Sequence, residues 1–322
     1  MANQITTDQL DKDVRTQEAQ SYTWTYANGR RYASSELGHY YMPNDEPEVQ
    51  RLNQQHWMLT EARGGSITLA PLPTKNALNI LDIGCGSGIW CLQMAEDHPN
   101  AKMVGADVSP VQPANKPENV EWIVLDFENG KWPFPENHFD LIHLSLVHGC
   151  VTDWEKTLTH IMQYVKPGGF IEHQEFAMGG QYILEQSGKR VNYSALQDPP
   201  AFARWPGLMC EAADKRGRTL HLGPKLKEMQ ERAGLVGVEE AIYPLAIGTW
   251  PEDNRQKLVG TQFLHNVLTG IDGFTMVLFT TQLGWSVEAT KSFIEDCKKD
   301  LRDNSLRKMM DLYVVYGQKP AA

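Results

Sequence analysis

The chain has 322 residues, a formal net charge of -10 and 22% charged residues. This length suffices for a core domain with a smaller cap, which is the arrangement that we expect. No block of Lys or Arg offsets the negative charge, and this excludes nucleic acid or an anionic membrane as partner, because both require a basic footprint. A small-molecule partner fits this composition better.

The N-terminal part, residues 1–73, is predicted to be an arm followed by lid helices. Residues 6–20 have mixed charges and little apolar periodicity, which indicates a loose arm or a solvated helix. A Pro-Asn-Asp-Glu turn at 43–46 then caps a predicted helix over residues 47–61. Aromatic residues gather before this helix, either as a packed arm or as a lid over a bound ligand: Tyr22, Trp24, Tyr26, Tyr32, Tyr40 and Tyr41.

A glycine-rich turn at residues 84–88 follows a short apolar strand and precedes a predicted helix over 89–96. Strand, glycine turn and helix form a nucleotide-type cradle. A dinucleotide fingerprint would need glycine at position 89, where the chain has Ile89, and no Lys-Ser/Thr pair completes a phosphate loop. The compact D-x-G-x-G-x-G spacing instead suits S-adenosylmethionine, because Asp82 can attract its ammonium group while backbone amides hold its carboxylate.

Two further strands end in acidic residues, and this strengthens the S-adenosylmethionine prediction. The strand at 103–106 ends in Asp107, which can accept hydrogen bonds from both ribose hydroxyls. The strand at 120–125 ends in Asp126 and Phe127, which can bind the adenine amino group and cover the base. The predicted cofactor-binding residues are Asp82, Gly84, Cys85, Gly86, Gly88, Asp107, Val108, Asp126, Phe127, Ser145 and Tyr32.

Strands and helices alternate from residue 74 to 176, which predicts the cofactor-binding core, a parallel sheet with right-handed crossovers. Its last members are a strand at 139–145, a helix capped by Asp153 and ended by the Lys-Pro-Gly-Gly run at 166–169, and a strand at 170–175. The rest of the chain, 177–322, supplies a sixth strand at 238–245, a seventh at 312–317 and two helical insertions. We expect these insertions to form a substrate cap over the carboxyl ends of the strands.

Apolar and aromatic residues of these insertions are candidates for an acceptor pocket, although the same residues could pack in the core: Trp205, Met209, Phe263, His265, Phe274 and Phe279. A base helps if the acceptor is a hydroxyl or a thiol, and His148, just after the fourth strand, is the first candidate. His143, His173 and His265 are alternatives. Placement alone could suffice for a neutral amine or an ionised acceptor, and no metal is required.

The cysteines are odd in number and contain no C-x-x-C pair, so they indicate neither a disulfide framework nor a zinc site. The first 20 residues are polar and acidic, unlike a secretory or mitochondrial leader, and the apolar stretch near 274–279 is too short to span a bilayer. We therefore expect a cytoplasmic protein with reduced thiols.

Several runs of this chain resemble the fungal class I methyltransferases related to the secondary-metabolism regulator LaeA. The matching runs are 43–46, 81–90, 105–113 (GADVSPVQP), 142–154, 166–169, 211–218, 247–251, 283–286 and 313–317. The resemblance implies an α/β fold with a seven-stranded, Rossmann-like methyltransferase sheet, and S-adenosylmethionine bound at the glycine turn. Relatives usually have arginine where this chain has Ser145 and serine where it has Cys150, so substrate contacts near the fourth strand do not transfer.

The resemblance also frames the expected function. Some members of the family methylate small natural products, whereas others act as regulators. We expect methyl transfer to an oxygen, nitrogen, sulfur or carbon atom of a small secondary metabolite. The alternative is a regulatory protein that keeps the methyltransferase fold and acts through protein partners, in which case a nuclear location is possible.

Overall fold

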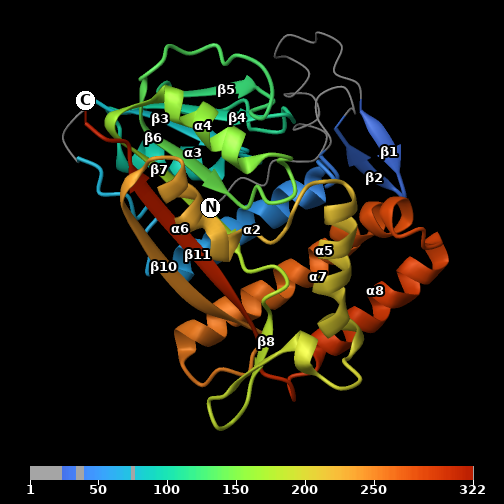
Figure 1. Ribbon diagram of the computed structural model, residues 1–322. Helices are drawn as coiled ribbons and strands as arrows, with labels where there is room; N and C mark the ends of the chain where they lie inside the picture. The colour runs from blue at the N-terminus through green and yellow to red at the C-terminus, as the bar shows by residue number, and fades with distance from the viewer. Residues whose placement is uncertain (1–23, 34–39, 74–76, 322) are drawn as a thin grey trace.

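One large β-sheet organises the protein, as Figure 1 shows. The computed structural model describes residues 24–33, 40–73 and 77–321. The main strands are β3 (Asn79–Ile83), β4 (Lys102–Asp107), β5 (Val120–Val124), β6 (Phe139–Ser145), β7 (Val165–Phe176), β10 (Val236–Ile247) and β11 (Lys308–Gln318). They lie in the order β5-β4-β3-β6-β7-β11, with β10 on the far side of β11. The predicted α/β fold class is confirmed.

The direction of the chain reverses between β3 and β6, and this reversal positions the site. From β3 the chain moves outward through β4 to β5, then returns to place β6 and β7 on the other side of β3, and all four of these pairings are parallel. Strand β11 runs antiparallel to both β7 and β10. In such sheets ligands bind at the carboxyl ends of the strands where the order reverses, here above β3 and β6.

Within the described residues the sheet has nine strands rather than the seven expected, because a hairpin extends it. Strands β8 (Tyr182–Leu184) and β9 (Arg190–Asn192) pair with each other, and β8 continues along β11 beyond the end of β7. Each has only three residues, so neither is long enough to show strand periodicity in the sequence. The helix before β7 also ends earlier than predicted, at Tyr164, and the Lys-Pro-Gly-Gly run lies within β7, where the β6–β7 register shifts.

Apart from α2, the α-helices of the described residues form two groups. Those that flank the sheet are α3 (Ile89–Asp97), α4 (Trp154–Tyr164) and α6 (Leu226–Arg232); those of the cap are α5 (Ala201–Lys215), α7 (Asn254–Gln282) and α8 (Val287–Arg302). Two short 3₁₀ turns are η2 (Tyr193–Ala195) and η3 (Gly223–Lys225). The predicted Asp153 cap is confirmed, because its side chain accepts a hydrogen bond from the Lys156 backbone N–H. Helix α5 follows β7, and helices α7 and α8 follow β10, where the sequence predicted two helical insertions.

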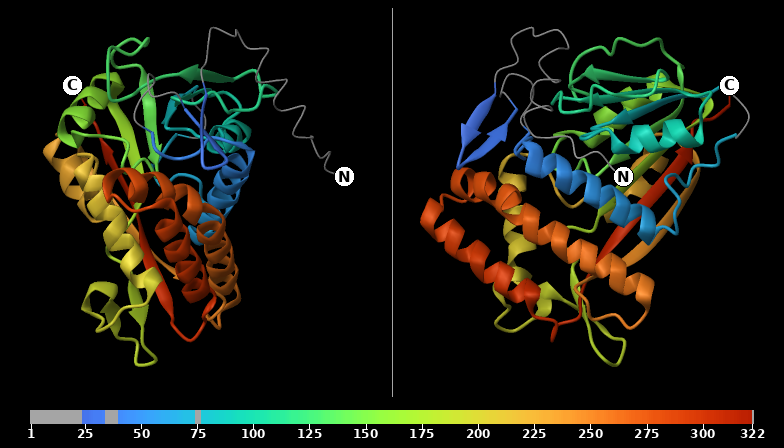
Figure 2. Two further views of the ribbon diagram at one scale, coloured as in Figure 1. Left: turned by 90° about the vertical axis from the view of Figure 1, so that its right-hand side faces the viewer. Right: turned by 180° about the vertical axis from the view of Figure 1, so that it is seen from behind.

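Helix α2 (Glu46–Ala62) joins the N-terminal part to the cap. It runs beside α7, as the rear view in Figure 2 shows, and the largest hydrophobic core unites α2 with the three cap helices. Asp45 caps it through the Glu48 backbone N–H. Helix α2 therefore lies between the sheet and the cap.

A β-hairpin precedes α2 where the sequence predicted an arm or an aromatic lid. Strands β1 (Thr25–Ala27) and β2 (Arg30–Tyr32) are joined by Asn28 and Gly29, both with positive φ, which is the chemistry of a tight hairpin turn. An ion pair at 2.6 Å between Arg30 and Asp45 ties the hairpin to the start of α2. The predictions for residues 6–20 and for Tyr22 lie outside the described residues.

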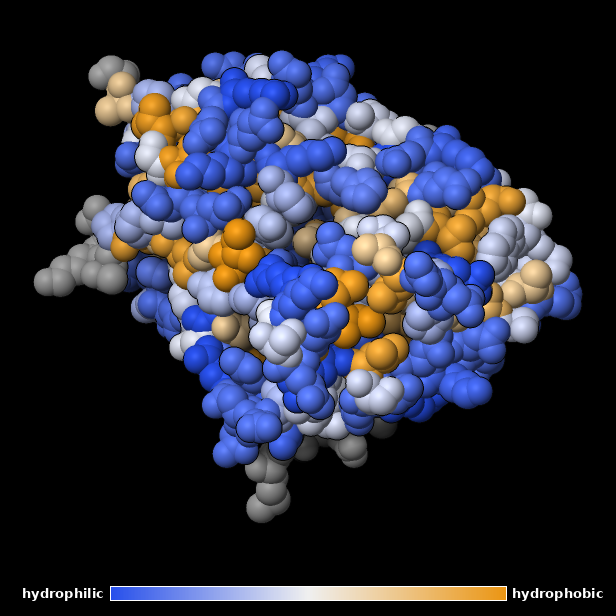
Figure 3. Space-filling view, turned by 60° about the horizontal axis from the view of Figure 1, so that its bottom comes forward, coloured by the Kyte–Doolittle hydropathy of each residue, from blue (hydrophilic) through white to orange (hydrophobic). Residues whose placement is uncertain are grey.

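Among the described residues no helix combines the length and apolar character that crossing a bilayer requires. On the face in Figure 3, apolar side chains occur in small groups separated by hydrophilic ones.

Candidate active site

A cavity of about 360 Å³ lies above the carboxyl ends of the parallel strands and below the helices α2, α5 and α7. Most of the residues predicted for the cofactor and the acceptor lie in its wall. The predicted residues that line it are Gly84, Gly86, Asp107, Val108, Asp126, Phe127, Ser145, His148, Trp205, Met209 and Phe274. The residues predicted to bind the cofactor and those predicted to bind the acceptor therefore line the same cavity.

A smaller cavity of about 70 Å³ adjoins the first beneath α2. Its wall contains Asp82 and Cys85 from the predicted set, and it shares Gly84, Gly86 and Ser145 with the larger cavity. The predicted cofactor residues thus occupy two connected spaces around the glycine turn.

Of the residues predicted for the cofactor or the acceptor pocket, five line neither cavity: Tyr32, Gly88, Phe263, His265 and Phe279. Phe263 stacks on Phe176 and Phe279 packs against Trp285 and Phe293, so both belong to the core. The sequence could not separate them from Phe274, because α7 is buried on more than one face.

His265 and Tyr32 lie elsewhere. His265 is exposed on α7, one position before Asn266, which does reach the cavity. Tyr32 is buried in β2, where burial raises the pKa of its hydroxyl. Two other tyrosines of the aromatic cluster, Tyr40 and Tyr41, line the cavity instead.

The glycines of the turn have different roles. Gly84, Gly86 and Gly88 all have positive φ, at 67°, 53° and 78°, which other residues adopt only with strain. A Cβ on Gly88 would lie 2.6 Å from the Trp122 ring, so this glycine lets α3 begin close to β5 rather than facing a ligand. Only Gly84 and Gly86 present their backbone to the cavities.

Asp107 has the geometry that a vicinal diol requires. One carboxylate oxygen accepts a hydrogen bond from the Gly86 backbone N–H at 2.9 Å, and the other accepts one from Ser109 at 2.8 Å. Each oxygen keeps a lone pair, so two neighbouring hydroxyls could donate to the same carboxylate. Burial raises the pKa of Asp107 to about 6 despite these two donors.

The Asp82 carboxylate contacts His143 and Cys91. His143 lies 2.8 Å from one of its oxygens and stacks on the Trp90 ring at 3.9 Å, while the Cys91 thiol lies 3.6 Å from the other oxygen. Asp82 still lines the small cavity, as does Ser87.

The small cavity fits the methionine part of S-adenosylmethionine. The Ser87 hydroxyl is buried there without a hydrogen-bond partner among the described residues. It can donate to a carboxylate, and Asp82 can accept from an ammonium group. Helix α2 adds Gln55 and His56 to this wall.

Asp126 shapes the edge of the larger cavity. Its oxygens accept hydrogen bonds from the Glu128 backbone N–H at 3.1 Å and from the Asn129 amide at 2.8 Å. Phe127 beside it is buried and also lines the cavity.

His148 is paired with a carboxylate that the sequence analysis missed. Its Nδ1 lies 2.5 Å from Glu175, which is fully buried in β7. A signal existed, because residues 172–175 are four consecutive polar residues within a strand that is buried on both faces.

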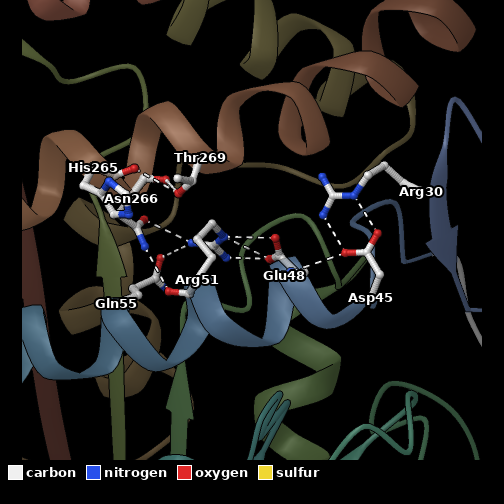
Figure 4. A network of polar contacts seen from close by, with 8 residues as sticks. All are labelled: Arg30, Asp45, Glu48, Arg51, Gln55, His265, Asn266 and Thr269. Atoms are coloured by element: carbon white, nitrogen blue, oxygen red, sulfur yellow. Dashed lines mark hydrogen bonds and ion pairs between the residues drawn. The ribbon is translucent and has the colours of Figure 1, made fainter. Parts of the chain in front are cut away.

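A polar network between α2 and α7 forms another part of the wall that the sequence analysis missed (Figure 4). The buried Arg51 guanidinium donates to Glu48 at 2.6 Å, to Gln55 at 2.7 Å and to Asn266 at 3.0 Å. It also lies 4.9 Å from the centre of the Phe274 ring. Because Glu48 neutralises its charge, Arg51 fixes the two helices together rather than attracting an anion into the cavity.

Comparison with known proteins agrees with this geometry. A family model described as a methyltransferase domain matches residues 54–240. The methyltransferase pytC of Aspergillus terreus is 32% identical over 92% of this chain and 88% of its own length. The secondary metabolism regulator LAE1 of Cochliobolus heterostrophus is 28% identical over 91% of this chain and 94% of its own.

Among solved structures, the chain is similar to phosphoethanolamine N-methyltransferase 2 of Haemonchus contortus, with a TM-score of 0.47 and 19% identity. That structure contains phosphomonomethylethanolamine and S-adenosylhomocysteine. The match covers 83% of this chain and about half, 52%, of that one.

The sheet order, the glycine turn and the family match define a class I methyltransferase that uses S-adenosylmethionine. Within this class, the chain belongs to the LaeA-like methyltransferases of fungal secondary metabolism, as its relatives show.

Proposed function

We propose that this methyltransferase acts on a small-molecule acceptor that binds in the 360 Å³ cavity. The main support for this proposal is that Asp107 and Val108 of the sheet line the same cavity as Trp205, Met209 and Phe274 of the cap helices. Its volume lies within the range of small-molecule sites, roughly 300 to 1,000 Å³.

The proposed cofactor contacts follow the walls of the two cavities. Asp107 accepts from the ribose hydroxyls, and Asp126 with Phe127 borders the adenine. Asp82 and Ser87 hold the methionine ammonium and carboxylate in the smaller cavity. Cys85, Val108, Ser145 and the backbone of Gly84 and Gly86 complete the contact surface. Tyr32 and Gly88, which line neither cavity, have no contact in this proposal.

The cofactor, when bound, supplies a methyl group that is already electrophilic. The remaining task of the protein is to hold a nucleophile in line, roughly 3 to 3.5 Å from the methyl carbon, and to exclude water. Trp205 and Phe274 supply apolar walls for this purpose, and His148 is the proposed base.

The test of this proposal follows a labelled methyl group. The protein is incubated with methyl-labelled S-adenosylmethionine and a metabolite extract from a strain that lacks it. We expect label in one or a few solvent-extractable small molecules, and a His148→Ala variant that transfers it more than tenfold more slowly with little loss of cofactor affinity. Label found in protein only, with none in metabolites, would contradict the proposal.

A regulatory function is the second candidate, and the relative named as a secondary metabolism regulator favours it. In that case the fold would act through protein partners. Recovery of stable regulator partners by affinity purification, together with no methyl transfer to any metabolite, would favour this candidate over the first.

A further inference from the structure

We propose that Glu175 is the positioning residue for His148, and that the acceptor is an aromatic hydroxyl whose proton His148 removes. This inference rests on the proposed small-molecule function. It adds a residue that works through His148 and a chemical class for the acceptor.

Three donors fix the Glu175 carboxylate. One oxygen faces Nδ1 of His148 at 2.5 Å, and the other accepts from the Val147 backbone N–H at 2.8 Å and from Nε2 of His173 at 3.0 Å. The Glu175 side chain is fully buried, so its orientation is set by these contacts rather than by water.

The backbone before His148 is bent to allow this contact. Leu146 has φ of 53°, a left-handed conformation that is strained for a branched residue. It directs the chain back over β7 after β6 ends, and the Val147 backbone N–H can then donate to Glu175. Strain of this kind persists where the surrounding structure holds it, and it is frequent at functional sites.

The charge of Glu175 decides which nitrogen of His148 carries the proton. Burial acts to raise the pKa of the Glu175 carboxyl, but His148 and the hydrogen bonds from His148 and His173 outweigh burial and hold this pKa below its usual value. An ionised carboxylate only accepts hydrogen bonds, so Nδ1 of His148 donates. In the neutral imidazole, Nε2 on the opposite side of the ring then carries a free lone pair.

His148 is placed to use that lone pair. Its side chain is 16% exposed and lines the cavity, whereas Glu175 behind it has no access to the cavity. Two other titratable groups of the same wall do not compete as bases near neutral pH. Burial raises the pKa of the Cys150 thiol to about 12, and burial also raises the pKa of the Tyr41 hydroxyl.

The other walls indicate the class of acceptor. Aromatic and thioether side chains line the same cavity as His148, and such groups pack well against an aromatic ring: Phe176, Met178, Trp205, Met209, Phe274 and Met310. A neutral amine needs no base before it attacks, whereas a phenolic hydroxyl, with a pKa of about 10, gains from one. The acceptor oxygen bonds to the methyl carbon as the carbon–sulfur bond breaks with its electron pair to sulfur, and the hydroxyl proton passes to Nε2 of His148.

The positioning role is tested by the exchange Glu175→Gln, which keeps the shape and changes the charge. A glutamine amide can donate to Nδ1, which moves the imidazole proton to Nε2 and removes the base. We expect nitrogen NMR to show the proton of His148 on Nδ1 in the wild type and on Nε2 in the variant. Turnover should fall about a hundredfold or more at unchanged cofactor affinity, and Glu175→Asp should recover part of it.

Glu172→Gln is the matched control. Glu172 is equally buried on β7 but faces the other way, where it accepts from the backbone of Leu69 and Ala70. This control should leave the His148 tautomer unchanged. A proton on Nε2 of His148 in the wild type, or a tautomer that does not respond to Glu175→Gln, would overturn the positioning role.

The acceptor class is tested with S-adenosylmethionine that carries a ¹³C methyl group, in the same metabolite extract. The carbon shift of the transferred methyl distinguishes a methoxy group from N-, S- or C-methyl products. We expect an aromatic methoxy signal. Transfer to nitrogen, sulfur or carbon would overturn the inference while leaving the proposed function intact, whereas no transfer to any small molecule would count against the proposed function itself.

Discussion

The two sides of the cavity are built in different ways. The cofactor side comes mostly from a short part of the chain, between Asp82 and Phe127, whose residues lie at or just after the ends of three strands; Ser145 and helix α2 complete it. The acceptor side brings together residues as far apart as Tyr40 and Met310, from α2, α5, α7, β7 and β11. A local pattern therefore specifies the first side, and only tertiary packing specifies the second.

This difference predicts that the two sides respond to different perturbations. The acceptor side should be sensitive to the contacts that join distant elements. The cofactor side, with its buried titratable groups, should be sensitive to pH.

The largest effect is expected from Arg51→Ala on the acceptor side. Removing this side chain leaves the buried Glu48 carboxylate without its partner and removes one of the two hydrogen bonds between Arg51 and Asn266 on α7, since the Arg51 backbone carbonyl still accepts from Asn266. We expect a loss of about 3 to 5 kcal/mol in the free energy of unfolding, measured by urea denaturation.

A double variant, Glu48→Leu with Arg51→Met, serves as the control. It removes both charges and should recover much of this loss. A stability of Arg51→Ala within about 1 kcal/mol of the wild type would show that the network does not hold α2 and α7 together.

A smaller effect is expected at His56, on the cofactor side. Burial lowers the pKa of its imidazole to about 4, so the unfolded chain takes up a proton below pH 6.5 that the folded protein does not. The contribution of His56 to the stability of the folded protein is therefore fully present above pH 6.5 and is lost as the pH falls toward 4. Between pH 7.5 and pH 5, the protonation of His56 in the unfolded chain should lower the free energy of unfolding by about 2 kcal/mol.

Comparing the wild type with His56→Gln isolates that contribution. The variant should lose about 2 kcal/mol less than the wild type between the two pH values. Equal losses in the two proteins would mean that His56 is protonated in the folded state.

The smallest effect concerns cofactor affinity. Because burial raises the pKa of Asp107 to about 6, the carboxyl is mostly protonated at pH 5, where it accepts hydrogen bonds from the ribose less well than the ionised carboxylate. S-adenosylmethionine should bind about tenfold more weakly at pH 5 than at pH 7.5 by calorimetry. Asp107→Asn should bind weakly at both; if it keeps the tenfold change, another group is responsible.

The cofactor side could be predicted from the sequence because each of its signals spans only a few consecutive residues. An apolar strand, a glycine turn and an acidic strand end each span fewer than ten residues, so β3, β4 and β5 and the position of Asp107 follow directly. The cap could be predicted as helical, but not which face of each helix turns toward the cavity. Phe274 faces it and Phe279, one and a half turns later, does not.

The partner of His148 could not be predicted by spacing. Glu175 lies 27 residues away, on the neighbouring strand, and it meets His148 only because Leu146 adopts a left-handed conformation. A leucine in the sequence does not predict a left-handed conformation, whereas a glycine would indicate one. The hairpin before α2, in contrast, was readable from its Asn28-Gly29 pair.

The most direct test of the account is an experimental structure of the protein with S-adenosylhomocysteine bound. The account predicts the ribose hydroxyls on the Asp107 carboxylate, the amino-acid end beside Asp82 and Ser87, and the sulfur atom facing the space between His148 and Trp205. A nucleoside bound outside these two cavities, or a sulfur atom that faces away from the cap, would contradict it.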